Sequence, residues 1–99
     1  MRPAGQFSIA MEHPCLPGHF PGNPVVPGVV LLEEVFGLIM AAHPGRMVIG
    51  LPQVRFLAPV LPGQVVEVAA GPAAGGLGFT GAVAGRNVLR GTLELGPLP

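Results

Sequence analysis

One histidine and one glutamate of this chain stand in a pattern that suits acid–base chemistry. His19 opens the run HFPGNPVVPGVVLLEE, and Glu33 comes near its end. An imidazole has an unperturbed pKa near neutrality, so His19 suits a general base. A carboxyl group on an apolar helix tends to stay protonated, so Glu33 suits a general acid. The run therefore predicts a base and an acid carried by neighbouring elements.

The elements that must position this pair are a rigid loop and a helix. Five prolines between Glu12 and Pro27 fix φ and favour an ordered, non-helical loop. Pro27 fits the first turn of a helix that is expected to reach Ala42. The Gly28 N–H at its start has no intrahelical partner, so it can donate to a developing negative charge.

The expected helix is apolar nearly all round, which predicts burial on most sides. Glu33 and Glu34 are its two polar positions, and the pattern alone does not separate them. His43 is expected to cap its C-terminus, where Pro44 and Gly45 end it.

Strands are expected before and after this helix in the sequence. The apolar alternation of Gln6–Met11 predicts a strand after a loose start at 1–5. Four more are expected after the helix, with a break near Gly50 and Pro52 and a tight hairpin at Gly85-Arg86-Asn87. They cover Arg46–Leu57, Gln64–Ala70, Leu77–Ala84 and Asn87–Leu95. This order predicts one α+β domain over residues 1–99, with a sheet around a central helix.

Composition narrows the partners. The net charge is zero and the sequence pI is about 6.8, so no basic field for nucleic acid or for a membrane surface is expected. With 49% hydrophobic and 10% charged residues, some apolar surface should be covered by a second copy or by an apolar ligand. Cys15 is the single cysteine, which favours a reducing, cytoplasmic compartment. His13, Cys15 and His19 match no familiar zinc spacing, so no metal is expected.

The motif His19-Phe20-Pro21-Gly22, followed by Pro24, Pro27, Gly28 and Glu33, resembles the active-site segment of FabZ/FabA-type β-hydroxyacyl-ACP dehydratases. A second block, Val54–Gly63, resembles the same family's R-F-x-x-P-V-x-P-G turn. The resemblance covers about Phe7 to Leu95 and implies the hotdog fold, an antiparallel sheet wrapped around one long helix. The family's N-terminal helix and first strand are missing here, as in the short dehydratase-like proteins of polyketide and aryl-polyene pathways.

The resemblance implies a lyase of the 3-hydroxyacyl-[acyl-carrier-protein] dehydratase class, acting in fatty-acid or polyketide-type biosynthesis without a cofactor. His19 would be the base, Glu33 rather than Glu34 the acid, and the Gly28 backbone N–H the donor to the thioester oxygen. Relatives assemble this site in a homodimer, with the histidine from one subunit and the acid from the other, and dimers can assemble further. The residues expected to contact the acyl substrate are Phe20, Pro21, Gly22, Phe36 and Phe56, although core packing explains the phenylalanines equally well.

Several positions depart from the family pattern. Gln64 stands where an Asp is usual, and Gly37 replaces a Gln that often follows the acid. Leu57 and Ala58 replace basic residues that help relatives hold the acidic carrier protein. Two other functions stay open: a hotdog thioesterase in which Glu33 activates water, and a non-catalytic acyl-binding subunit that pairs with an active relative.

Overall fold

The computed structural model of the chain describes residues 1–14 and 24–99. One helix and one five-stranded antiparallel sheet make up the described regular structure. Their bounds are β1 Arg2–Phe7, α1 Gly28–Ala42, β2 Arg46–Phe56, β3 Val66–Ala73, β4 Gly76–Val83 and β5 Arg86–Pro97. The strands lie in the order β1-β3-β4-β5-β2, so β1 and β2 form the two edges. This arrangement confirms the predicted α+β hotdog class.

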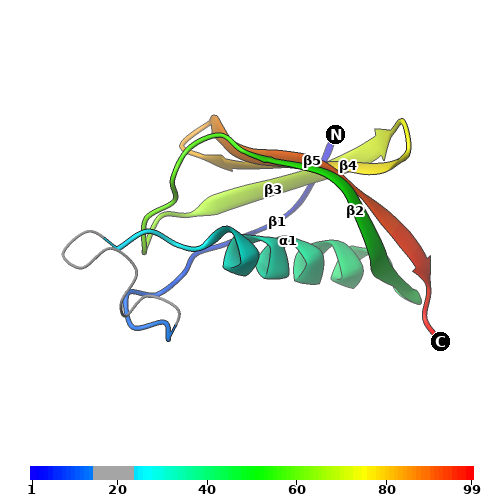
Figure 1. The fold of residues 1–99 in the computed structure, drawn as a ribbon, viewed down its shortest axis with the longest axis horizontal. Coiled ribbons are helices and arrows are strands. Elements are labelled where there is room, and N and C mark those ends of the chain that lie inside the picture. The colour runs from blue at the N-terminus through cyan, green and yellow to red at the C-terminus, as the bar shows by residue number, and fades with distance from the viewer. Residues whose placement is uncertain (15–23) are drawn as a thin grey trace.

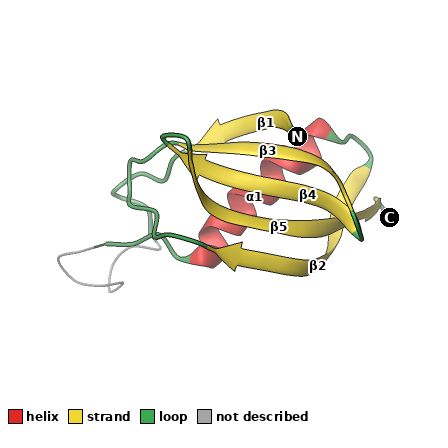
Figure 2. Ribbon diagram, turned by 90° about the horizontal axis from the view of Figure 1, so that it is seen from above, coloured by secondary structure: helices red, strands yellow, loops and turns green. Residues whose placement is uncertain are grey.

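The sheet curls over one side of α1, which runs diagonally beneath the strands (Figures 1 and 2). Leu31, Val35 and Ile39 lie on the covered side of the helix and are at most 3% exposed. They pack against sheet residues that include Val66, Val68, Phe79, Leu89 and Leu93. Burying such side chains contributes about 1.5–3 kcal/mol each, so this contact holds the two layers together.

The opposite side of α1 is open in the single chain. Val29 is 64% exposed there, and Glu33, Gly37 and Met40 are also exposed. The prediction that the helix is buried on most sides is therefore wrong for one chain, because the sheet covers a single face. No helix of the described residues is long and apolar enough to cross a membrane.

β1 lies earlier in the chain than the alternation predicts, because only Gln6 and Phe7 of the strand expected over Gln6–Met11 belong to it. It pairs with β3 from Arg2 opposite Ala70 to Phe7 opposite Val66, so the loose start expected at residues 1–5 is wrong. Gly5 marks the reason: the register shifts there, φ is +129°, and a Cβ would lie 2.8 Å from Leu38 Cδ2. Residues 2–5 therefore show no regular alternation of apolar side chains, because Gly5 lies under a helix side chain and the pairing partner is a distant strand. The sequence alone does not reveal this part of β1.

The other strands follow the predictions with small shifts. The register of β2 against β5 shifts on both sides of Gly50, which confirms the predicted break. The β4–β5 turn lies at Ala84 and Gly85, one residue before the predicted position. Both residues have positive φ, at 51° and 81°, as the tightest hairpin turn requires.

Candidate active site

The segment expected to carry the base lies outside the described residues. His19, Phe20, Pro21 and Gly22 fall within residues 15–23. Their predicted roles, as base and as substrate contacts, therefore stay predictions. Cys15 lies in the same range, and residues 1–14 and 24–99 contain no cluster of three or more side chains able to bind a metal.

The chain on both sides of this segment is held by the connection between β2 and β3. The Gly63 N–H donates to the Ile9 carbonyl at 2.8 Å, and the Val26 N–H donates to the Val60 carbonyl at 2.9 Å. The side chains of Ile9, Val26 and Val60 are all at most 3% exposed. One connection therefore fixes where the chain leaves β1 and where it enters α1.

The sequence predicts residues 58–63 only as a turn and misses this bracing role. Val60 is the available signal, because a branched apolar side chain between Pro59 and Pro62 would be unusual in a turn that only faces water. Its 2% exposure shows that it anchors the turn to the core.

Gly28 is the first residue of α1, as the motif requires. The Pro27 carbonyl accepts the N–H groups of Val30 and Leu31 at 3.0 and 3.3 Å. The Gly28 N–H precedes this first turn and has no acceptor among the described residues. A free N–H at the positive end of a helix dipole can bind a partial negative charge.

Phe56, at the end of β2, packs directly against Gly28. A Cβ built on Gly28 would lie 2.7 Å from Phe56 Cζ, so only glycine lets the ring approach this closely. The ring is nevertheless 49% exposed, so it forms an apolar wall beside the helix N-terminus. The predicted substrate contact is therefore placed next to the predicted oxyanion donor.

Glu33 and Glu34 are both exposed in the single chain. Glu33 points to the open side of the helix, which it shares with Val29 and Gly37 by helical spacing. The described residues of this chain therefore do not provide the apolar surroundings expected for the acid.

Phe36 is half-buried and packs against the edge of the core. It lies one turn after Leu32 and close to the open face, so it is available to a substrate or a partner on that side. At the other end of α1, His43 Nδ1 donates to the Ile39 carbonyl at 2.8 Å, and its backbone N–H donates to the Met40 carbonyl at 3.1 Å. This confirms the predicted C-terminal cap.

An antiparallel sheet curled over one long helix places this protein in the hotdog class. An uncharacterised protein from Erwinia carotovora subsp. atroseptica shares this fold with a TM-score of 0.76 and 25% identity, over 94% of this chain and 81% of that one. The dehydratase heterocomplex ApeI:P from Xenorhabdus doucetiae shares it with a TM-score of 0.77 and 22% identity, over 91% and 82% of the two chains.

The sequence comparisons identify the family. A model described as ApeI-like, ApeI dehydratase, matches residues 2–87, and the chain belongs to this family. It is also 34% identical over 76 residues to the 3-hydroxyacyl-[acyl-carrier-protein] dehydratase FabZ of Chloroflexus aggregans, covering 69% of this chain and 53% of that protein. FabZ of Herpetosiphon aurantiacus is 36% identical over 69% of this chain and 54% of its own. The chain thus spans about half the length of these curated relatives.

Proposed function

We propose that this protein is a 3-hydroxyacyl-thioester dehydratase that eliminates water to give a 2-enoyl thioester. The observation that carries the proposal is the complete His19-to-Glu33 motif in a chain of the ApeI-like family, with its glycine at the start of the helix. FabZ relatives at 34–36% identity support the same chemistry.

In the proposed reaction, His19 removes the proton α to the thioester carbonyl. Negative charge then grows on the thioester oxygen, and the Gly28 N–H donates to it. A preorganised donor at this position stabilises the transition state. The C–O bond at C3 breaks as Glu33 gives its proton to the leaving hydroxyl, which departs as water. The proton held by His19 returns to Glu33, so the enzyme is restored without a cofactor.

A second copy would complete the site. The open face of α1 carries Val29 and Met40 beside Glu33, and such a face is apolar enough to bind a partner. We place a second copy there, so that His19 of one subunit works with Glu33 of the other. The half-exposed Phe56 and the half-buried Phe36 would line the acyl site with Phe20, Pro21 and Gly22.

An acyl carrier protein would present the substrate, in fatty-acid or polyketide-type biosynthesis. Both FabZ relatives are named for carrier-bound substrates, which supports this choice over a free coenzyme thioester. We place the protein in the cytoplasm, as one hotdog domain over residues 1–99, and propose no nucleic-acid or membrane partner.

The decisive test is mass spectrometry of a 3-hydroxyacyl carrier-protein thioester incubated with the purified protein, beside His19→Ala. The expected result is loss of one water with the native protein, and a rate lower by about 10²–10⁴-fold with the variant. Release of free carboxylic acid would instead identify a thioesterase. No turnover by a folded protein would identify a non-catalytic subunit, and either result overturns the proposal.

A further inference from the structure

The face of the sheet that points away from α1 carries a different set of side chains from the candidate site. Residues that pair across the strands show which side chains share this outer face: Ala69, Thr80, Arg90 and Arg55 form one row across β3, β4, β5 and β2. Small side chains and glycines make this face shallow. One hollow of about 440 Å³ lies over β5 and β2, lined in part by Gln53, Arg55, Thr80 and Arg90.

Arg55 and Arg90 stand directly opposite each other in the pairing of β2 with β5. Within residues 1–14 and 24–99, neither guanidinium has a hydrogen bond or an ion pair. Like charges at directly opposed positions, with Cβ atoms about 4.5–5.5 Å apart, destabilise a sheet. The fold therefore gains nothing from this pair, and an external anion would relieve the repulsion.

The pair lies at the end of the molecule that holds the candidate site. Arg55 immediately precedes Phe56, and successive side chains of a strand point to opposite faces. The Phe56 ring contacts Gly28 on the inner side, so the guanidinium of Arg55 lies on the outer side at the same position along β2. Arg86 is also exposed at this end, but it pairs with Val83, which packs against the core, so it lies on the inner side and is not part of the opposed pair.

An exposed apolar side chain, Leu57, lies between the arginines and the candidate site. Leu57, 47% exposed, follows β2 and lines a hollow of about 330 Å³ with Ala58, Arg86 and Asn87. This hollow lies at the end of β2, which is an edge strand of the sheet. A partner bound on the outer arginines could therefore pass a flexible arm around this end to Gly28.

We propose that Arg55 and Arg90 form the docking surface for an acidic partner, the acyl carrier protein. This inference rests on the proposed function, because it concerns the partner that presents the substrate. Charge complementarity carries it: two directly opposed arginines without partners in the described residues lie beside the site, in a chain whose net charge is zero. Leu57 and Ala58 carry no charge themselves, so the arginines take over the task of holding the carrier.

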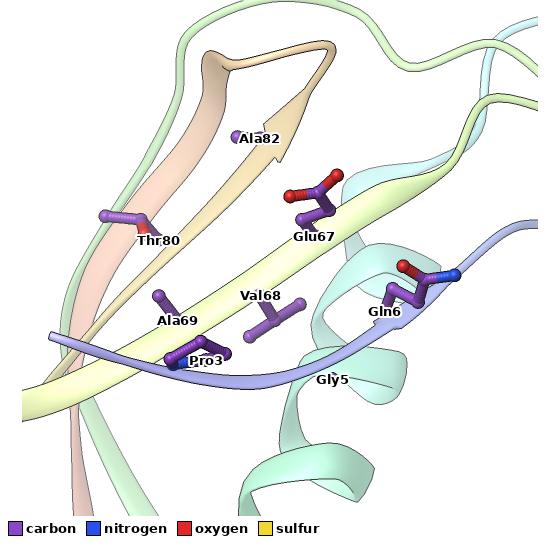
Figure 3. A pocket seen from close by; sticks show the side chains of 8 residues that line it. All are labelled: Pro3, Gly5, Gln6, Glu67, Val68, Ala69, Thr80 and Ala82. Atoms are coloured by element: carbon purple, nitrogen blue, oxygen red, sulfur yellow. The ribbon is translucent and has the colours of Figure 1, made fainter.

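The outer face carries negative charge on one side and positive charge on the other, which orients an acidic partner. Figure 3 shows Glu67 rising from β3 beside Gln6 of β1, across a second hollow of about 330 Å³. Ala69 and Ala82 separate this carboxylate from the arginines over β5 and β2. An acidic partner is attracted to the arginine side and repelled from the Glu67 side.

The test compares two substrates with the same acyl group, one on the carrier protein and one on pantetheine alone. Arg90→Glu and Arg55→Glu should lower kcat/KM for the carrier substrate by about ten-fold or more, mainly through KM. The pantetheine thioester should be turned over as by the native protein. Reversing one charge of an opposed pair relieves repulsion, so both variants should fold.

Arg2→Glu is the matched control, because Arg2 is exposed at the far end of α1, near His43. It makes the same charge change and should leave both substrates unaffected. Variants at Arg55 and Arg90 that use the carrier substrate like the native protein would overturn the docking proposal and leave the dehydratase intact. If the native protein dehydrates neither substrate, the proposed function fails. Docking is then judged by titrating the carrier protein onto native and Arg90→Glu protein, where equal affinity would overturn it.

Discussion

The two faces of α1 differ in how far the sheet covers them. On the sheet side, Leu31, Val35 and Ile39 are at most 3% exposed and interlock with the strands. On the open side, Val29 is 64% exposed, and Gly37 has no neighbour within 4 Å of a built Cβ. The covered face explains why the chain folds. The open face buries little apolar surface in the single chain, so it contributes little to folding.

The largest effect that would sharpen this contrast is expected at Glu33. Glu33→Gln should lower kcat by about 10²–10⁴-fold, because the leaving hydroxyl loses its acid. The free energy of unfolding should change by about 0.5 kcal/mol at most, since the side chain is exposed. Kinetics and urea unfolding measure both quantities. Glu34→Gln is the control. An equal loss of rate in that variant would contradict the assignment of the acid to Glu33.

On the covered face the expected balance is reversed. Ile39→Ala removes a fully buried side chain and should lower the free energy of unfolding by about 2–5 kcal/mol. The turnover per folded molecule should stay the same, since Ile39 lies on the buried face of the helix, more than one turn from Glu33 and about three turns from Gly28. Urea unfolding followed by circular dichroism measures the loss. A variant that stays as stable as the native protein would show that the sheet does not hold this face.

At the N-terminus of the helix, one substitution should disturb both side-chain packing and the catalytic rate. Gly28→Ala places a methyl group 2.7 Å from Phe56 Cζ, so the ring must move. We expect kcat to fall by about ten-fold, because a misplaced donor stabilises the transition state less. Phe56→Leu is the companion variant, since it removes the clash. If Gly28→Ala combined with Phe56→Leu recovers no activity, ring displacement is not the cause.

The smallest effect is expected at Gly37. Its built Cβ meets nothing within 4 Å, so Gly37→Ala should stabilise the isolated helix by up to about 1 kcal/mol. If a second copy covers this face, the added methyl group should weaken the dimer. Analytical ultracentrifugation measures the dissociation constant. An unchanged constant would place the second copy elsewhere.

Much of the fold could be predicted from the sequence, because its signals are local. Prolines and glycines mark the start of α1 near Pro27 and its end after His43, and the helix lies within one residue of the predicted bounds. The start of β1 could not be predicted, since the register shift at Gly5 hides the alternation and its partner β3 is far along the chain.

The candidate site was predictable in part for the same reason. Gly28 follows from the motif, and its place at the start of α1 is as expected. The brace between Val26 and Val60, and the opposed pair of Arg55 and Arg90, arise from pairing between distant segments. No local pattern reveals such register. The exposure of Glu33 follows from the sheet covering one face of α1, which the apolar pattern of the helix does not reveal.

The strand order also has a consequence for synthesis on the ribosome. β1 is the first strand to emerge, yet it pairs only with β3, and β2 pairs only with β5. Both edge strands therefore wait for partners made much later, while α1 can form early from local contacts. The sheet closes over the helix only after residues 86–97 have appeared. Until β5 has been synthesised, the apolar strands remain exposed and prone to aggregation. Synthesis of the last strand therefore determines when the nascent chain is protected from aggregation.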